Sequence, residues 1–215
     1  MLRVKYPQGA EKMLVQALLG REVPAGGLPL DVGVVVVNVA TAAEIGHLLP
    51  DGQGIQERVI TDFGAGRRRQ KGQLPHPDRH AAALRTRLRR RERRRDPGVI
   101  RAGPMMGAAL PSLDLPITKG TSGFIAFTSR ETGRRPPVYP CINCGYCVDA
   151  CPLFLNPAHL GLLARNGRHE EAARDFHLMD CFECGSCAYV CPSHLPLVQT
   201  FRAAKRSVRE DSKKP

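Results

Sequence analysis

Long hydrophobic runs are missing from this sequence of 215 residues. Residues 32–40 form the longest apolar run, and Gly33 and Asn38 interrupt it, whereas a membrane-spanning helix needs about 20 apolar residues. Residues 1–10 have no apolar core of the kind that a secretory signal contains. We therefore expect a cytoplasmic chain without a spanning helix. Thiols stay reduced in that compartment, so clustered cysteines indicate metal ligands rather than disulfides.

Acidic and aromatic residues are scarce in the middle of the chain. Between Gly64 and Gly103, 13 Arg and one Lys accompany three acidic residues, and this stretch carries +11 of the net charge of +12. Such a segment cannot bury enough apolar surface to offset the entropy of ordering, so we expect it to be disordered, or a solvated helix in its C-terminal half. Residues 65–101 contain no aromatic side chain to interleave with bases, and we expect no nucleic-acid partner.

Constellations of catalytic side chains are missing as well. No nucleophile–base pair, Walker loop or pair of carboxylates stands out in the sequence. We therefore expect no autonomous catalysis by side chains, and any chemistry to come from cofactors.

All eight cysteines lie in two copies of one pattern, C-x2-C-x2-C-x3-C-P, as PCINCGYCVDACP and, 40 residues later, DCFECGSCAYVCP. A 4Fe-4S cube needs one soft anionic ligand at each of its four iron corners, and thiolate is such a ligand. The spacers let three sulfurs of one loop reach three corners, while the fourth cysteine leads away on the next helix and serves the other cluster. We therefore predict two clusters, one on Cys141, Cys144, Cys147 and Cys191 and the other on Cys181, Cys184, Cys187 and Cys151.

Structural zinc and disulfides are the alternatives for these cysteines. Zinc usually takes its ligands from two separated C-x2-C pairs, and the third and fourth cysteines of each motif fit that pattern poorly. Within the loops, Gly145 and Gly185 stand where a positive φ and a close backbone approach are needed. Apolar neighbours of the cysteines, Ile142 and Leu195 among them, are expected to form an apolar shell.

Helical patterns surround the motifs. The spacer between them predicts two short helices, the first capped by Asn156 with Pro157 at its first position. Residues 196–209 predict a helix that packs Phe201 inward and places cations such as Lys205 near its end, where they are favoured. This helix-rich arrangement resembles the α-helical ferredoxins of respiratory iron–sulfur subunits rather than a βαββαβ ferredoxin.

The remaining sequence predicts a mixture of helix and strand, so the fold class is α+β. Residues 11–19 predict an amphipathic helix with Leu14, Leu18 and Leu19 on one face. The continuous β-branched run VGVVVVNVA at residues 32–40 predicts a strand that is buried on both faces. Residues 103–138 predict short strands between turns.

Together these residues closely resemble one family, the C subunit of the Rnf (Rsx) ion-translocating electron transport complex. The shared strings are KYPQGAEKML, GREVPAGGLPLDVGVVVVNVAT, GPMMG, PSLDLPITKGTSG and both cysteine motifs. The resemblance implies a peripheral subunit on the cytoplasmic side of the inner membrane, which takes electrons from NADH through FMN and passes them through clusters to the other subunits of the complex. It also implies a domain similar to the flavin-binding subunit of respiratory complex I.

The chain departs from the family at its N-terminal end. The family's glycine-rich flavin and nucleotide loop should precede KYPQGAE, but only four residues stand before Lys5. We interpret the chain as an N-terminally truncated member, with residues 1–63 as a remnant of a complex-I-flavoprotein-like α/β domain. By similarity, Glu11, Asn38 and Thr41 are candidate remnants of a flavin-facing surface. Alone they cannot form a site, so we expect this chain by itself to bind neither FMN nor NADH.

A second departure lies in the Arg-rich residues 64–102, which stand where the family has a β-grasp domain. We hypothesise that residues 65–96 are translated in a shifted reading frame. With chosen synonymous codons, residues 71–87 read one base later give RGNYRIPIGTPLRYAL, which resembles the family's GNY…IGTPL segment. The gene's nucleotide sequence tests this hypothesis, which fails if no single-base shift recovers that segment. A connecting β segment at residues 103–138 and a two-cluster ferredoxin-type domain at residues 139–210 complete the chain.

The leading expectation is therefore electron transfer through two 4Fe-4S clusters, as the peripheral C subunit of a membrane-bound, NADH-linked ion pump. The alternative is an independent soluble ferredoxin-like carrier, whose Arg-rich arm docks acidic partners. Reduction by NADH without an added reductase would favour a flavin function retained in this chain.

Overall fold

The structure is a computed structural model that describes residues 5–50, 52, 60–64, 67–72, 98–112, 118, 120–127, 132–133 and 136–212, with the backbone alone at residues 47, 61–64 and 67–72. The chain divides into two compact units, which are described separately. One unit joins Met1–Val36 to Pro136–Pro215, and the other is Val37–Arg135. The described part contains no helix that is both long enough and apolar enough to cross a membrane.

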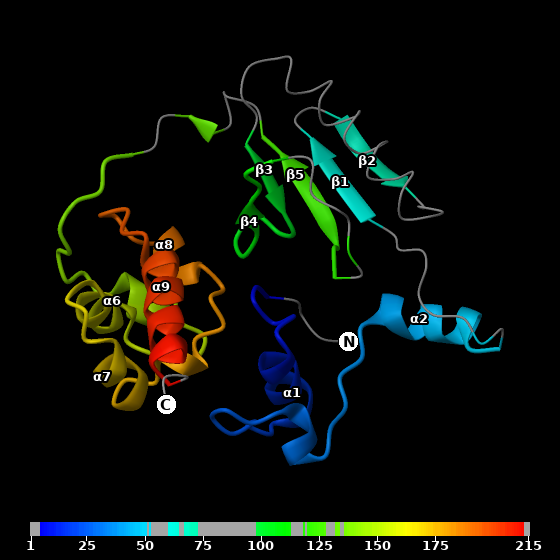
Figure 1. The fold of residues 1–215 in the computed structure, drawn as a ribbon, viewed down its shortest axis with the longest axis horizontal. Coiled ribbons are helices and arrows are strands. Elements are labelled where there is room, and N and C mark those ends of the chain that lie inside the picture. The colour runs from blue at the N-terminus through cyan, green and yellow to red at the C-terminus, as the bar shows by residue number, and fades with distance from the viewer. Residues whose placement is uncertain are drawn as a thin grey trace. The chain divides into compact units, whose positions relative to one another are not determined.

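The second unit contains a helix, α2 (Val39–Leu48), and a sheet of five strands in the order β2-β1-β5-β3-β4 (Figure 1). The parallel pair β1–β5 lies inside the sheet, and the other neighbours are antiparallel. The buried core of this unit consists of Ile60, Val99, Phe124 and Ala126. The short strands expected within residues 103–138 are confirmed. The strands are β1 (Ile60–Gly64), β2 (Arg67–Gly72), β3 (Val99–Arg101), β4 (Ala108–Ala109) and β5 (Gly123–Ala126).

The Arg-rich segment differs from its prediction in one part. Its composition predicted no packed structure, whereas Arg67–Gly72 forms β2 and pairs with β1. Strand pairing uses the hydrogen bonds of the backbone, so an edge strand can form without large apolar side chains. The reading-frame hypothesis concerns mainly residues that lie outside the described ones, at 65–66 and 73–97.

The prediction of a buried strand at residues 32–40 is wrong. The 3-10 helix η1 (Pro29–Val32) ends inside this run, residues 34–38 are irregular, and α2 begins at Val39. Val35 and Val39 are 75% and 82% exposed. A β-branched run forms a doubly buried strand only between two neighbouring strands and two covering layers. Among the described residues, no strand pairs with this run.

The N-terminal helix of the first unit is confirmed, with a different buried face. Helix α1 (Glu11–Leu19) has the predicted bounds and ends at Gly20, whose φ of 65° is left-handed. Its buried residue is Val15, at 2% exposure, whereas Leu18 and Leu19 are 57% and 52% exposed. Two of the three leucines of the predicted apolar face are therefore exposed, and Leu14 is half-buried.

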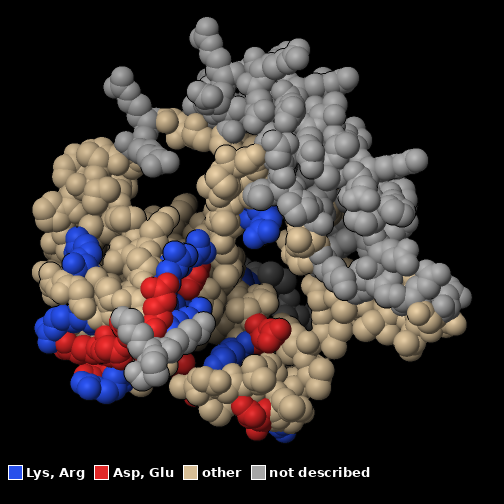
Figure 2. Space-filling view, in the orientation of Figure 1, with Lys and Arg blue, Asp and Glu red and all other residues tan. Residues whose placement is uncertain are grey.

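The cysteine-containing part of the first unit is helical, as predicted. Asn156 caps α6, because its side-chain oxygen accepts from the backbone N–H of His159 at 3.1 Å, and Pro157 takes the first helical position. Charged side chains of both signs lie side by side around α7, where Arg168 pairs with Glu171 (Figure 2). The elements are α5 (Tyr146–Asp149), α6 (Pro157–Arg165), α7 (His169–Arg174), η2 (Leu178–Asp180), α8 (Ser186–Tyr189) and α9 (Leu197–Asp211).

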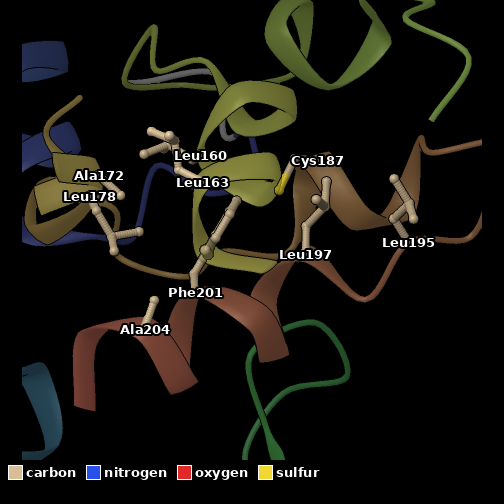
Figure 3. Close-up of a cluster of buried hydrophobic side chains, with 10 residues drawn as sticks. Leu160, Leu163, Ala172, Leu178, Cys187, Leu195, Leu197, Phe201 and Ala204 are labelled. Carbon is tan, nitrogen blue, oxygen red and sulfur yellow. The ribbon is translucent and has the colours of Figure 1, made fainter. Parts of the chain in front are cut away.

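One hydrophobic core holds these helices together. Phe201 is 1% exposed and extends from α9 toward α6, whose Leu160 is completely buried (Figure 3). The two helices approach closely at Gly161, where an added Cβ would lie 2.8 Å from a methyl carbon of Leu197. Burial of an aromatic side chain such as Phe201 contributes about 1.5–3 kcal/mol. This core positions the second cysteine motif, because Cys187 and Leu195 belong to it.

Candidate metal centre

The two cysteine loops have the same backbone conformation. Gly145 and Gly185 have φ values of 80° and 87°, which confirms the left-handed conformation predicted for both. Asn143 and Glu183, two residues before each glycine, are left-handed as well, at 56° and 62°. Short helices, α5 and α8, begin directly after the glycines. The repeat in the sequence is therefore a repeat in structure.

Three cysteines of the first predicted set interact electrostatically. Burial raises the pKa of the Cys147 thiol, backbone N–H groups partly oppose this, and the negative charges of Cys191 and Cys141 raise the pKa further. Cys191 belongs to the second motif by sequence, yet it acts on a thiol of the first. Cys141 and Cys144 are exposed.

All four cysteines of the second predicted set also interact. Burial raises the pKa of Cys187 to about 12, and repulsion from the thiolates of Cys181, Cys184 and Cys151 adds to the shift. The pKa of Cys181 is raised by burial too, with Cys184 and Cys151 among the charges that increase it. Cys151, the last cysteine of the first motif, is thus grouped with the thiols of the second.

The thiols of the second set line one pocket. It has about 340 Å³ free of atoms, part of which is open to solvent. Its walls also contain apolar groups of Leu155, Leu160, Val198 and Phe201, and the cysteines in its lining are Cys151, Cys181, Cys184 and Cys187.

This donor set consists of thiols, which as thiolates are the soft ligands that a 4Fe-4S cube takes. In the described residues, no three His, Cys, Asp or Glu side chains gather as they would around one metal ion. A 4Fe-4S cube instead spreads four thiolate ligands over four iron corners. Four soft donors in a pocket with apolar walls match that requirement, because apolar walls limit the access of water to a cluster.

Polar groups from two distant segments reach the second motif. The Tyr6 hydroxyl donates to the backbone carbonyl of Cys184, and the Lys205 ammonium donates to that of Cys181. The sequence predicts Lys205 only as a cation near the helix end, whereas the residue is 6% exposed and packs against the second motif. Lys205 follows Leu197 and Phe201 at intervals of four residues, and this helical spacing could have revealed that it shares their buried face.

The candidate flavin residues belong to two units that are described separately. Glu11 is exposed in the first turn of α1, in the first unit. Asn38 and Thr41 belong to the second unit, where Asn38 caps α2 by accepting from the backbone N–H of Ala40 at 3.0 Å. Asn38 thus has a local structural role, and the flavin role of all three stays a prediction.

Two family descriptions match separate parts of the chain. Residues 1–47 match the Nuo51 FMN-binding domain, and residues 140–195 match the 4Fe-4S dicluster domain. The second match covers all eight cysteines. The cysteine-containing part is therefore similar to the class of dicluster iron–sulfur domains.

Similar proteins extend this likeness to most of the chain. The C subunit of a proton-translocating ferredoxin:NAD(+) oxidoreductase complex from Clostridium ljungdahlii is 40% identical over 83% of this chain and 39% of its own length. The C subunits of ion-translocating oxidoreductase complexes from Pseudomonas aeruginosa and Yersinia pestis are 39% and 41% identical, over 99% and 95% of this chain. The chain spans only 27% and 33% of those two proteins. The resemblance to the C subunit of the Rnf complex is thereby confirmed.

Proposed function

We propose that this chain transfers electrons through two 4Fe-4S clusters, as a peripheral C subunit of a membrane-bound, NADH-linked and ion-translocating complex. The observation that carries the proposal is the grouping of thiols from both motifs around one apolar pocket. The similarity to the C subunits of such complexes supports the rest. In this proposal the chain works on the cytoplasmic side of the inner membrane, and its partners are the other subunits.

The proposed ligation is crossed between the motifs. Cys141, Cys144, Cys147 and Cys191 would hold one cluster, and Cys181, Cys184, Cys187 and Cys151 the other. Such clusters supply one-electron chemistry when bound, and the chain's residues hold, shield and tune them. The left-handed glycines shape both ligand loops, and the hydrophobic core that contains Cys187 shields part of the second set from water. Crossed ligation also ties the two halves of the repeat into one unit.

The proposal for flavin concerns the N-terminal segment of the chain. The match of residues 1–47 to an FMN-binding domain supports a segment that belongs to a flavin-binding unit in the family. Glu11, Asn38 and Thr41 would be remnants of its flavin-facing surface. We propose that members of this family bind FMN and NADH.

Metal analysis of the anaerobically prepared chain tests the central proposal. We expect about eight irons and eight sulfides per chain, with an EPR spectrum of two interacting reduced clusters. A chain that binds zinc and no iron would overturn it. Iron–sulfur clusters in a chain that does not associate with the other subunits would instead favour the independent soluble carrier.

Two serine variants test the crossed ligation. Cys151→Ser should lose about four irons and increase the labelling of the partly exposed Cys181 by iodoacetamide, while the first set stays protected. Cys191→Ser is the matched variant and should expose Cys141, Cys144 and Cys147 instead. Peptide mapping by mass spectrometry identifies the alkylated thiols. If each variant exposes the cysteines of its own motif, the ligation is not crossed.

A further inference from the structure

A charge cluster around the buried Lys205 lies beside the second cysteine set. Lys205 is 6% exposed, and its Nζ donates to the carbonyl oxygen of Cys181 and to Oε1 of Glu183, the latter at 3.1 Å. Arg202 Nε donates to the other carboxylate oxygen of Glu183 at 2.7 Å. Both bonds of Lys205 go to acceptors, which suits an ammonium, a group with donors only. Both cations thus contact the same carboxylate, that of Glu183.

Glu183 connects the charge cluster to the ligand loop. Its backbone N–H donates to the Cys181 sulfur at 3.4 Å, and its left-handed φ of 62° belongs to the turn of the loop. Its carboxylate accepts hydrogen bonds from Arg202 at one oxygen and from Lys205 at the other. The charges therefore stand within the loop that presents Cys181.

The first half of the repeat has no equivalent cluster at the matching positions. Forty residues before Glu183 stands the uncharged Asn143, whose side-chain oxygen accepts from the Cys141 thiol at 3.5 Å. Forty residues before Lys205 stands Arg165, which donates to the backbone carbonyl of Gly161 at 3.3 Å, within its own helix. The asymmetry is thus a property of particular residues, since the ligand spacing is the same in both halves.

We propose that Lys205 sets the reduction potential of the cluster on Cys181, Cys184, Cys187 and Cys151, and that its buried positive charge raises that potential. This inference rests on the proposed cluster function. Reduction adds one electron and makes a cluster more negative, so a nearby cation stabilises the reduced form more than the oxidised form. Burial strengthens the effect, because solvent and salt screen a buried charge less than an exposed one. Arg202 and Glu183 hold the ammonium in place, and Glu183 partly offsets its charge.

The test is a redox titration of the reconstituted full chain with dithionite as electron donor, followed by EPR. Lys205→Met keeps the length of the side chain and removes the charge. We expect one of the two midpoint potentials to fall, with an about tenfold smaller equilibrium constant for reduction, or about 59 mV for one electron. Lys205→Arg should retain the potential. Glu183→Gln removes the negative charge and should move the same potential upward.

Two controls test whether the change in potential belongs to the cluster of the second motif. Arg165→Met, the matching change in the first half, should leave both potentials in place. In a Cys191→Ser background, which retains the cluster of the second motif, Lys205→Met should still lower the remaining potential. If Lys205→Met has its full iron content and unchanged potentials, the inference about Lys205 is overturned, while the proposed function is not. Shifts of the same sign in Lys205→Met and Glu183→Gln would indicate structural damage and also overturn it, whereas a chain that binds no iron overturns both the inference and the proposed function.

Discussion

The two cysteine motifs share one spacing but lie in different surroundings. Cys141 and Cys144 of the first motif are exposed, whereas Cys184 and Cys187 of the second are each 8% exposed. The hydrophobic core lies behind the second motif, and Tyr6 reaches it from the far end of the chain. Cysteine spacing thus sets the shape of the loop, while residues remote in sequence set its protection.

The same contrast applies to the expected apolar shell. Leu195, which follows the second motif, is 5% exposed and belongs to the core. Ile142, in the first motif, is 66% exposed and does not join the core as Leu195 does. Val148 and Tyr146 are exposed as well. A cluster on the first set would therefore be the more accessible of the two to solvent and oxidants.

Oxidative removal of iron should show the largest difference between the two motifs. With ferricyanide and EDTA, we expect about four irons to leave first, because exposed thiolates are attacked before buried ones. Iodoacetamide added at that stage should label Cys141 and Cys144 but leave Cys184 and Cys187 protected. Mass spectrometry measures the labelling, and unfolded protein supplies the fully labelled control. Simultaneous labelling of both motifs would contradict the difference in protection.

Truncation of the core should have the next largest effect. Phe201→Ala removes an aromatic side chain that is 1% exposed and should lower the free energy of unfolding by about 3–5 kcal/mol. Urea denaturation followed by circular dichroism measures the change. The control is Phe154→Ala after the first motif, where the side chain is 94% exposed and we expect a change within about 0.5 kcal/mol. Similar losses in both variants would show that the core does not favour the second motif.

Helix capping should make the smallest difference to stability between the two halves of the repeat. Asn156 caps α6 after the first motif, whereas the corresponding residue before α9 is Pro196, which makes no side-chain cap. Asn156→Ala should cost about 1 kcal/mol of unfolding free energy, and Asn156→Asp, which can also cap, should retain most of it. The same denaturation measurement compares the two variants. An equal loss in both would assign the effect to something other than the cap.

Local patterns in the sequence predicted much of the candidate site. The left-handed glycines, the cap at Asn156, the bounds of α1 and the burial of Phe201 agree with the structure. Each of these depends on residues within a few positions of one another, where propensity and spacing act directly. The family resemblance was equally accessible, because it lies in continuous strings.

Predictions that required knowledge of neighbours were less successful. The run at residues 32–40 has the composition of a buried strand, but strand formation depends on partner strands that composition does not specify. Arg67–Gly72 shows the opposite case, because pairing with β1 makes a strand of a segment whose composition predicted none. Both differences arise because backbone hydrogen bonds in a sheet are made between segments, not within them.

The ligand types, their grouping into two loops and the turn at each glycine follow from residues that are close together in the chain. The burial of the second motif does not, because Tyr6 and Cys184 are 178 positions apart and meet only after folding. Lys205 is likewise an ordinary helical cation by sequence, and packing of α9 against the second loop makes it a buried charge beside Cys181. Chemistry that depends on the type and spacing of ligands is local, whereas exposure and electrostatic environment depend on every segment that packs around them.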